Sequence, residues 1–144
     1  MPKAVNSIPS YLSQCGELSN PEDLRQHNCL LYRLGGRLFN NWGYTNHSGS
    51  YRVKVGSNRV SNDTDIVRRW AIAGKGIAYR SQIDISSDLR NGKLIQLLSG
   101  FQSPPVELYL LCPSRKQVTP AVIAFREMLR EKCAQMMTKD KQPA

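Results

Sequence analysis

The segment that most constrains the fold of this chain is residues 59–81, RVSNDTDIVRRWAIAGKGIAYRS. The polar cluster Asn62-Asp63-Thr64 precedes a stretch of helical periodicity, and Gly74-Lys75-Gly76 follows that stretch. Asn and Asp are favoured helix N-caps, and glycine lets the chain leave a helix in a left-handed conformation. The run IAYRS that comes next is typical of a strand. The segment therefore predicts a helix that is followed at once by a strand.

Strand-like and helix-like segments alternate along the rest of the chain. Patterns typical of strands occur at residues 29–34, 52–55, 77–81, 93–98 and 106–112. Cap, proline and glycine signals indicate helices at residues 9–16, 21–24, 63–74, 84–92 and from Thr119-Pro120 onward. Alternating strands and helices predict an α/β layer fold.

In open α/β sheets, ligands bind beyond the carboxyl ends of the strands, where helix N-termini also point. By this rule the candidate ligand site consists of Tyr32-Arg33, Asn62-Asp63-Thr64 and Arg80-Ser81. Each part has a structural alternative. Only one of Asn62 and Asp63 can be the N-cap, and Arg80 can be a surface residue whose aliphatic stem packs on apolar neighbours.

Composition limits the class of protein. The chain has 144 residues, 40% of them hydrophobic, which is enough apolar material for one compact domain. The formal net charge of +9 favours anionic partners. The Lys and Arg residues are scattered rather than clustered with aromatic residues, so the pattern does not indicate direct nucleic-acid binding by this segment.

The motifs of the common enzyme and metal classes are absent from the sequence. Cys15, Cys29, Cys112 and Cys133 lie far apart, a spacing that fits neither a zinc site nor a disulfide scaffold. We therefore expect no catalytic residues, no metal and no cofactor, and the protein is not expected to be an enzyme. Without an apolar leader or a membrane-spanning run, the sequence predicts a soluble cytoplasmic protein with no membrane partner.

Four motifs occur together in a familiar order. IPSYLSQCGELSNPEDLRQHNCLLYR, VSNDTDIVRRWAIAGKGIAY, LRNGKLIQLL and VELYLLCPSRKQVTPAVIAFREML resemble successive segments of LysR-type transcriptional regulators. The match covers residues 5 to 133. Each motif is weak alone, and the four in register make the resemblance specific.

The resemblance implies a periplasmic-binding-protein-like (type 2) effector domain. Residues 9–105 would form a complete effector-binding lobe II, a mixed sheet flanked by helices. Residues 1–8 and 106–137 would supply the crossover strands and the C-terminal helix of lobe I, and residues 138–144 would be a disordered tail. The family's winged-helix domain is absent from this sequence, so the resemblance implies contact with DNA only through that missing N-terminal domain.

The family's effector lies between the lobes, which implies a small, anionic molecule contacted by Tyr32-Arg33 and Asn62-Asp63-Thr64. The usual pattern continues into an apolar pair and proline, whereas here Tyr79-Arg80-Ser81 follow, so Arg80 adds a candidate anion contact. The resemblance also implies a homo-oligomer in which effector binding shifts the arrangement of lobes and subunits.

Two alternatives remain at this point. The shared fold allows one lobe of a solute-binding transport protein, although the absence of a secretory signal and the closing signature favour the regulator. A truncated regulator fragment without independent activity is the other. In either case the last helix carries an apolar stripe, which we expect to be covered by another part of the protein or by a second copy. The stripe consists of Val122, Phe125, Met128, Leu129 and Cys133.

Overall fold

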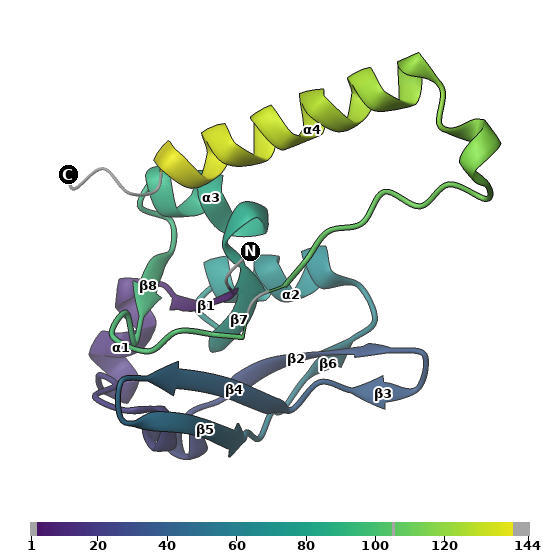
Figure 1. The fold of residues 1–144 in the computed structure, drawn as a ribbon. Helices are drawn as coiled ribbons and strands as arrows, with labels where there is room; N and C mark the ends of the chain where they lie inside the picture. The colour runs from purple at the N-terminus through teal and green to yellow at the C-terminus, as the bar shows by residue number, and fades with distance from the viewer. Residues whose placement is uncertain (1–2, 105, 140–144) are drawn as a thin grey trace.

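A mixed sheet organises the molecule (Figure 1), which the computed structural model describes for residues 3–104 and 106–139. The strand order is β3-β2-β7-β1-β8, and β6 also pairs with β2. Strands β2, β6 and β7 run parallel, whereas β1 is antiparallel to both β7 and β8. The strands are β1 Lys3–Ser7, β2 Cys29–Leu34, β3 Arg37–Leu38, β6 Val60–Ser61, β7 Ile77–Ser81 and β8 Ile95–Leu97.

Two layers cover this sheet. Helices α2 and α3 lie on one face, and a two-stranded hairpin of β4 and β5 lies on the other (Figure 1). The hairpin strands are β4 Asn41–Asn46 and β5 Gly49–Lys54. The helices are α1 Pro9–Cys15, η1 Pro21–Gln26, α2 Thr64–Ile72, α3 Gln82–Arg90, η2 Arg115–Gln117 and α4 Pro120–Lys139. The expected α/β fold is therefore confirmed.

The strand register assigns each side chain to one of two hydrophobic cores. Val5 pairs with Tyr79 on the hairpin face, and their neighbours Ala4 and Arg80 pair on the helix face. Because side chains alternate across a strand, the same rule holds for every strand of the sheet. The hairpin-side core contains Trp42 and Tyr44, and the helix-side core contains Leu30, Val67 and Ala78.

Strand β1 corrects the expected lobe boundary. Residues 1–8 were assigned to a crossover strand outside the lobe of residues 9–105, but β1 lies inside the sheet and is hydrogen-bonded to β7 and β8 on its two sides. Within the described residues, the sheet therefore begins at Lys3. Both neighbours of β1 are more than seventy residues away in the sequence, so local patterns give no signal for this position.

Residues 106–112 do not form the predicted strand. Their backbone is extended but unpaired within the described residues, and the large apolar side chains of Leu108, Tyr109 and Leu111 are 68%, 74% and 86% exposed. A strand exists only when a neighbour pairs with its backbone, and the described part of the chain places no strand beside this segment. The prediction was wrong because it rested on the pattern of apolar side chains alone and did not consider whether a neighbouring strand could pair with this backbone.

Helix α4 confirms the predicted start at Thr119-Pro120. The Thr119 hydroxyl oxygen accepts a hydrogen bond from the Val122 amide at 3.4 Å. The helix continues to Lys139, so the tail expected to be disordered from residue 138 is helical in its first two residues, and residues 140–144 lie outside the described part. As expected, large side chains of the apolar stripe are exposed, including Phe125 at 47% and Met128 at 48%.

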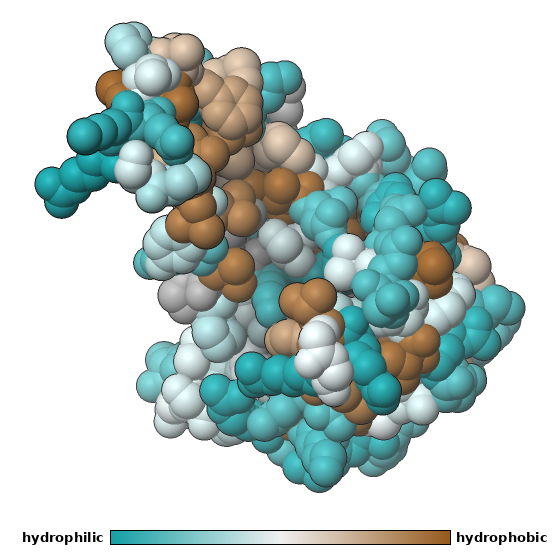
Figure 2. Space-filling view, turned by 90° about the vertical axis from the view of Figure 1, so that its right-hand side faces the viewer, coloured by the Kyte–Doolittle hydropathy of each residue, from teal (hydrophilic) through white to brown (hydrophobic). Residues whose placement is uncertain are grey.

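An open apolar groove of about 900 Å³ runs between α4 and the extended segment before it. Figure 2 shows brown, hydrophobic surface in the upper part of the molecule, where these two elements lie. The groove is lined by residues of α4, of segment 106–110 and by Ile83 of α3. Within residues 3–104 and 106–139, no helix combines the length and apolar character that crossing a bilayer requires.

Candidate functional site

Three parallel strands end at one edge of the sheet. Tyr32 of β2 is the register partner of Ser61 in β6, and Leu30 is the partner of Ala78 in β7. Two residues further on, Tyr32 and Arg80 therefore lie next to each other on the helix face. Helix α2 begins directly after Ser61. The structure thus brings together Tyr32, the start of α2 and Arg80, as the sequence predicts.

The residues at the start of α2 have different roles. Asp63 is the N-cap, and its Oδ1 accepts a hydrogen bond from the Asp65 amide at 2.8 Å. The Ser61 hydroxyl oxygen accepts from the Asp63 amide at 3.0 Å. Asn62 and Thr64 are both exposed. Asp63, and not Asn62, is therefore the N-cap of α2. The side chains of Asn62 and Thr64 remain exposed to solvent at this end of the sheet.

Tyr32 and Arg33 point to opposite faces of the sheet. The half-buried ring of Tyr32 stacks on Phe39, with ring centroids 4.5 Å apart and planes 5° from parallel. Arg33 is exposed and lies on the other face, with Leu31. Tyr32 therefore lies on the same face of the sheet as Arg80, and Arg33 lies exposed on the opposite face.

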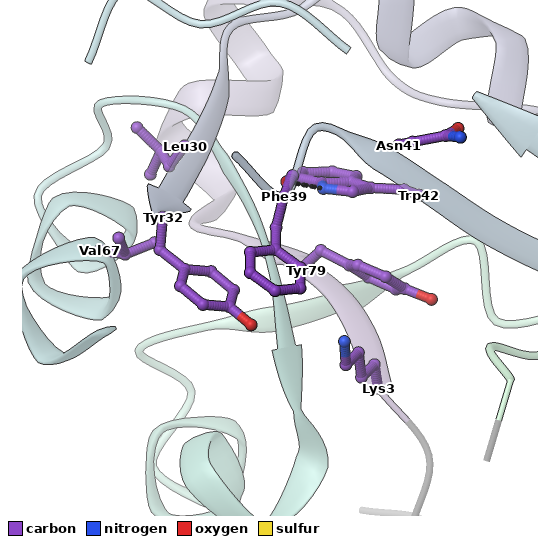
Figure 3. A pocket seen from close by; sticks show the side chains of 8 residues that line it. All are labelled: Lys3, Leu30, Tyr32, Phe39, Asn41, Trp42, Val67 and Tyr79. Carbon is purple, nitrogen blue, oxygen red and sulfur yellow. Dashed lines mark hydrogen bonds between the residues drawn. The ribbon is translucent and has the colours of Figure 1, made fainter. Parts of the chain in front are cut away.

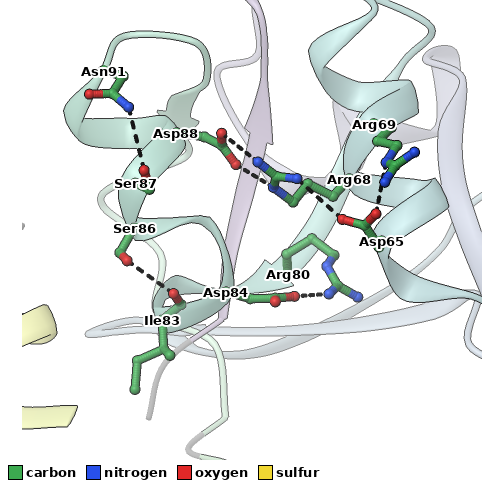
Figure 4. A network of polar contacts seen from close by, with 10 residues as sticks. All are labelled: Asp65, Arg68, Arg69, Arg80, Ile83, Asp84, Ser86, Ser87, Asp88 and Asn91. Atoms are coloured by element: carbon green, nitrogen blue, oxygen red, sulfur yellow. Dashed lines mark hydrogen bonds and ion pairs between the residues drawn. The ribbon is translucent and has the colours of Figure 1, made fainter. Parts of the chain in front are cut away.

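Arg80 is a buried residue, contrary to the surface alternative. It is 8% exposed, and its guanidinium pairs with Asp84 in the first turn of α3 (Figure 4). Its Nε has no hydrogen-bond partner among the described residues. Burial lowers the pKa of Arg80, and the nearby Tyr32 and Asp65 act in the opposite direction. Its neighbour Ser81 is half-buried opposite Lys3 of β1.

A second ion-pair system, which the sequence did not predict, lies beside Arg80. Arg68 binds both carboxylate oxygens of Asp88 and also contacts Asp65 at 3.2 Å (Figure 4). Arg69 pairs with the same Asp65 at 2.7 Å. Periodicity assigns Arg68 to the solvent face of α2, but the side chain is only 29% exposed and pairs with the buried Asp88 of α3. Arg68 and Asp88 are twenty residues apart, so no local pattern indicates the pair.

A small hollow lies around the end of the sheet, next to Tyr32 (Figure 3). Its volume is about 40 Å³, which is room for little more than a water molecule. The hollow is lined by Lys3, Leu30, Tyr32, Phe39, Asn41, Trp42, Val67 and Tyr79. It therefore forms a wall at this end of the sheet rather than a pocket that could enclose an organic molecule.

This wall combines a cation with aromatic rings. The Lys3 Nζ lies 5.4 Å from the ring centroid of Tyr79, whose ring stacks on Trp42 at 5.1 Å. Burial lowers the pKa of Lys3, and the charge of Arg80 acts in the same direction. The Tyr79 hydroxyl donates to the Gly43 carbonyl at 2.7 Å, and burial raises its pKa to about 12. Trp42 is also part of the hairpin-side core, and no local sequence pattern indicates Lys3 or Phe39 as site residues.

The described residues contain no group of three or more His, Cys, Asp or Glu side chains placed to hold a metal ion. All four cysteines are free, and burial raises the pKa of the Cys29 thiol to about 12, so this thiol is neutral near pH 7. The edge carries two cations, the buried Arg80 and the half-buried Lys3, and the ring of Tyr79 lies beside Lys3.

Comparison with known proteins gives consistent matches. The family model described as "LysR substrate binding domain" matches residues 7–134. The HTH-type transcriptional regulator DmlR of Escherichia coli K12 is 30% identical over 123 residues, which are 85% of this chain and 40% of that protein. The HTH-type transcriptional activator TtdR of the same strain is 34% identical over 92 residues, 64% of this chain and 30% of that protein. The chain thus spans less than half the length of these curated relatives.

Solved structures agree with this result. The regulatory domain of CrgA, a LysR-type transcriptional regulator from Neisseria meningitidis, matches with a TM-score of 0.66 and 26% identity, over 90% of this chain and 64% of that chain. Full-length AphB, the Vibrio cholerae virulence activator, matches with a TM-score of 0.63 and 25% identity, over 72% of this chain and 35% of that chain. The fold is that of a periplasmic-binding-protein-like (type 2) effector domain, as expected.

Proposed function

Because this chain belongs to the LysR substrate-binding domain family, we propose that it is the effector-sensing module of a LysR-type transcriptional regulator. The observation that carries the proposal is the meeting of Tyr32, Arg80 and the start of α2 at one edge of the sheet. This edge is where open α/β sheets bind ligands. DmlR and TtdR are named as HTH-type regulators, and we assign contact with DNA to a domain of that kind rather than to this sheet.

The proposed effector is a small organic anion. Arg80 and Lys3 supply positive charge, and Tyr32, Phe39 and Tyr79 supply ring surfaces for an apolar part. The exposed side chains of Asn62 and Thr64 and the half-buried Ser81 would donate or accept hydrogen bonds around it. Since the hollow holds only about 40 Å³, we propose that a second lobe closes over the effector.

Two roles differ from the sequence-based expectation. Asp63 uses its carboxylate to cap α2, so in this proposal it orients the helix and does not contact an anion. Arg33 is exposed on the opposite face from Tyr32, so it would contact the effector only from the rim. The proposed effector-binding set keeps Tyr32, Asn62, Thr64, Arg80 and Ser81 at its centre.

The proposal extends to the cell and to assembly. None of the relatives described above is named as a transport protein or an enzyme, which supports a regulator over the solute-binding alternative. A regulator acts where DNA is, so we propose a cytoplasmic location. We also propose self-association, because the apolar groove beside α4 is open to solvent.

A thermal denaturation screen tests the function. The chain is heated with small organic acids, each paired with its neutral amide. We expect one or more acids to raise the melting temperature while the matched amides do not, and we expect Arg80→Gln to remove the effect. Equal stabilisation by acids and amides, or equal stabilisation of the Arg80→Gln protein, would contradict the proposal.

A further inference from the structure

A buried arginine with an unused donor lies beside the candidate site. Arg80 is 8% exposed, and its Nε makes no hydrogen bond within the described residues. The Arg80 guanidinium forms an ion pair with Asp84 through its Nη2 atom. Figure 4 shows the guanidinium with Asp84 on one side and with Asp65, in the first turn of α2, above it. Tyr32 is also close enough to act on its charge.

The ion pair with Asp84 uses only one of the two donors, Nε and Nη2, on this side of the Arg80 guanidinium. Nε and Nη2 together form a planar fork that binds both oxygens of one carboxylate. Asp84 engages Nη2, while Nε is buried and has no hydrogen-bond partner among the described residues. The two partners are also unequally held, because the Arg80 side chain is 9% exposed and that of Asp84 is 44% exposed. Asp84 can therefore move into water, whereas Arg80 cannot.

We propose that Asp84 is an internal competitor for the effector, and that it neutralises Arg80 until the carboxylate of the effector displaces it. The incoming carboxylate takes both Nε and Nη2, and Asp84 turns outward into solvent. This inference rests on the proposed function, since it requires the effector to bind at this edge. It assigns to Asp84 the role of a competitor, which neither the sequence pattern nor the family match indicates.

The displacement also reaches the next helix. Asp84 lies in the first turn of α3, and α3 contacts α4 (Figure 1). Release of the Arg80–Asp84 pair therefore removes a tie between β7 and the helix that supports α4. An effector that fills the fork would change the environment of residues 82–86 without touching them.

Nuclear magnetic resonance on the ¹⁵N-labelled chain tests this inference, with sodium benzoate as the probe carboxylate and benzamide as its neutral counterpart. The Nε–H signal of Arg80 reports the fork directly. We expect benzoate, but not benzamide, to shift that signal and the amide signals of residues 82–86. We expect Asp84→Asn to bind benzoate about tenfold more tightly, because the competent state no longer has to be freed from Asp84.

Three variants separate this role from general effects. Asp84→Ser repeats the loss of the competitor with a different side chain and should also bind more tightly. Arg80→Lys keeps the charge but loses the fork, so it should bind benzoate more weakly than the wild type. Glu22→Gln removes one negative charge from the distant, exposed Arg25 pair and should leave the affinity unchanged.

Unchanged or weaker benzoate binding by both Asp84 variants would overturn the inference, as would an Arg80 Nε–H signal that does not move in any protein. An equal gain in Glu22→Gln would reduce the effect to net charge and would overturn it as well. If organic acids still stabilise the wild type through Arg80 in the thermal screen, the proposed function survives these results. If no acid does so, both fail.

Discussion

Arg68 of α2 binds both carboxylate oxygens of Asp88 on α3, through contacts of 2.6 Å from Nε and 2.9 Å from Nη2. Asp88 is only 1% exposed, so its charge has little contact with water. The pair fixes the two helices of one layer to each other. It thereby holds the start of α2 next to the end of β7, where the candidate site lies.

Removing one partner of this pair should be costly. We expect Asp88→Ala to lower the free energy of unfolding by about 3–5 kcal/mol, because Arg68 would keep a partly buried charge without its main counter-ion. Urea denaturation measures the change. Arg69→Ala serves as the control, since the Arg69–Asp65 pair is exposed and such pairs contribute at most about 1 kcal/mol. Similar losses in the two variants would show that Asp88 is no more than a surface charge.

Gly76 occupies a position that has no room for a side chain. A Cβ atom there would lie 2.4 Å from the Asn28 carbonyl oxygen, which accepts a hydrogen bond from the Ile77 amide at 2.9 Å. We expect Gly76→Ala to destabilise the fold by at least about 2 kcal/mol, because β2 and β7 would have to move apart. Gly100→Ala is the matched control, since a Cβ at Gly100 meets nothing within 4 Å. Thermal unfolding that is equal in both variants would refute this reasoning.

The buried thiol of Cys29 predicts a loss of stability at high pH. Its pKa is raised from 9.0 to about 12 in the folded chain. The unfolded state therefore releases this proton near pH 9 while the folded state keeps it, so stability is full below pH 9 and falls as the pH rises toward 12. Between pH 8 and pH 10 the thiol should account for about 1.4 kcal/mol of that loss.

Urea unfolding of the wild type and of Cys29→Ala at both pH values isolates this contribution. The variant should be less stable at pH 8, because it leaves a small cavity, but its decline toward pH 10 should be shallower. Tyr79, whose pKa is also raised to about 12, remains in both proteins and cancels in the comparison. Parallel declines would mean that the thiol ionises equally easily in the folded and unfolded states.

Local signals predict the elements of this fold well, and they fail where pairing is distant. The caps and glycines around α2 and the Thr119-Pro120 start of α4 depend on neighbours within a few residues, and both helices form as predicted. Residues 106–112 have the apolar pattern of a strand, but the described part of the chain places no strand beside them. Strand β1 has the neighbours that residues 106–112 lack, but local patterns do not indicate them. Its place inside the sheet depends on pairing with the distant strands β7 and β8.

The candidate site shows the same limit. The rule that ligands bind at the carboxyl ends of strands correctly places Tyr32 beside Arg80, since both follow from parallel pairing. It also places Arg33 in the site, although strand alternation turns that side chain to the other face. Lys3 and Phe39 were not predicted because they reach the hollow from β1 and from the short connection between β3 and β4. Asp84 was not predicted because its partner Arg80, four residues earlier, lies in β7 and not on the same helix, so helical spacing gives no signal for this pair.

The open groove beside α4 predicts self-association of the isolated chain. Phe125 and Leu129 are 47% and 38% exposed, and the extended segment opposite them exposes Leu108 at 68%. We expect a second copy to cover these side chains, because each copy offers the same apolar segment and the same groove. Light scattering should therefore report a dimer or larger species.

A double substitution provides the control for this association. Phe125→Glu with Leu129→Glu should shift the population toward the monomer, while Glu131→Gln on the exposed polar face should not. A wild-type chain that stays monomeric at concentrations of roughly 100 μM would be inconsistent with an interface of this kind, which ordinarily gives at least micromolar affinity when about 1,600 Å² is buried.

The effector-sensing account is tested most directly by mapping where a stabilising organic acid binds. The backbone amide signals of the ¹⁵N-labelled chain are followed while the acid that most raises the melting temperature is added. We predict that the largest shifts fall on Tyr32, on residues 61–65 and on residues 80–81, which meet at one edge of the sheet. Largest shifts along α4 and residues 106–110, with the sheet edge unmoved, would contradict the account.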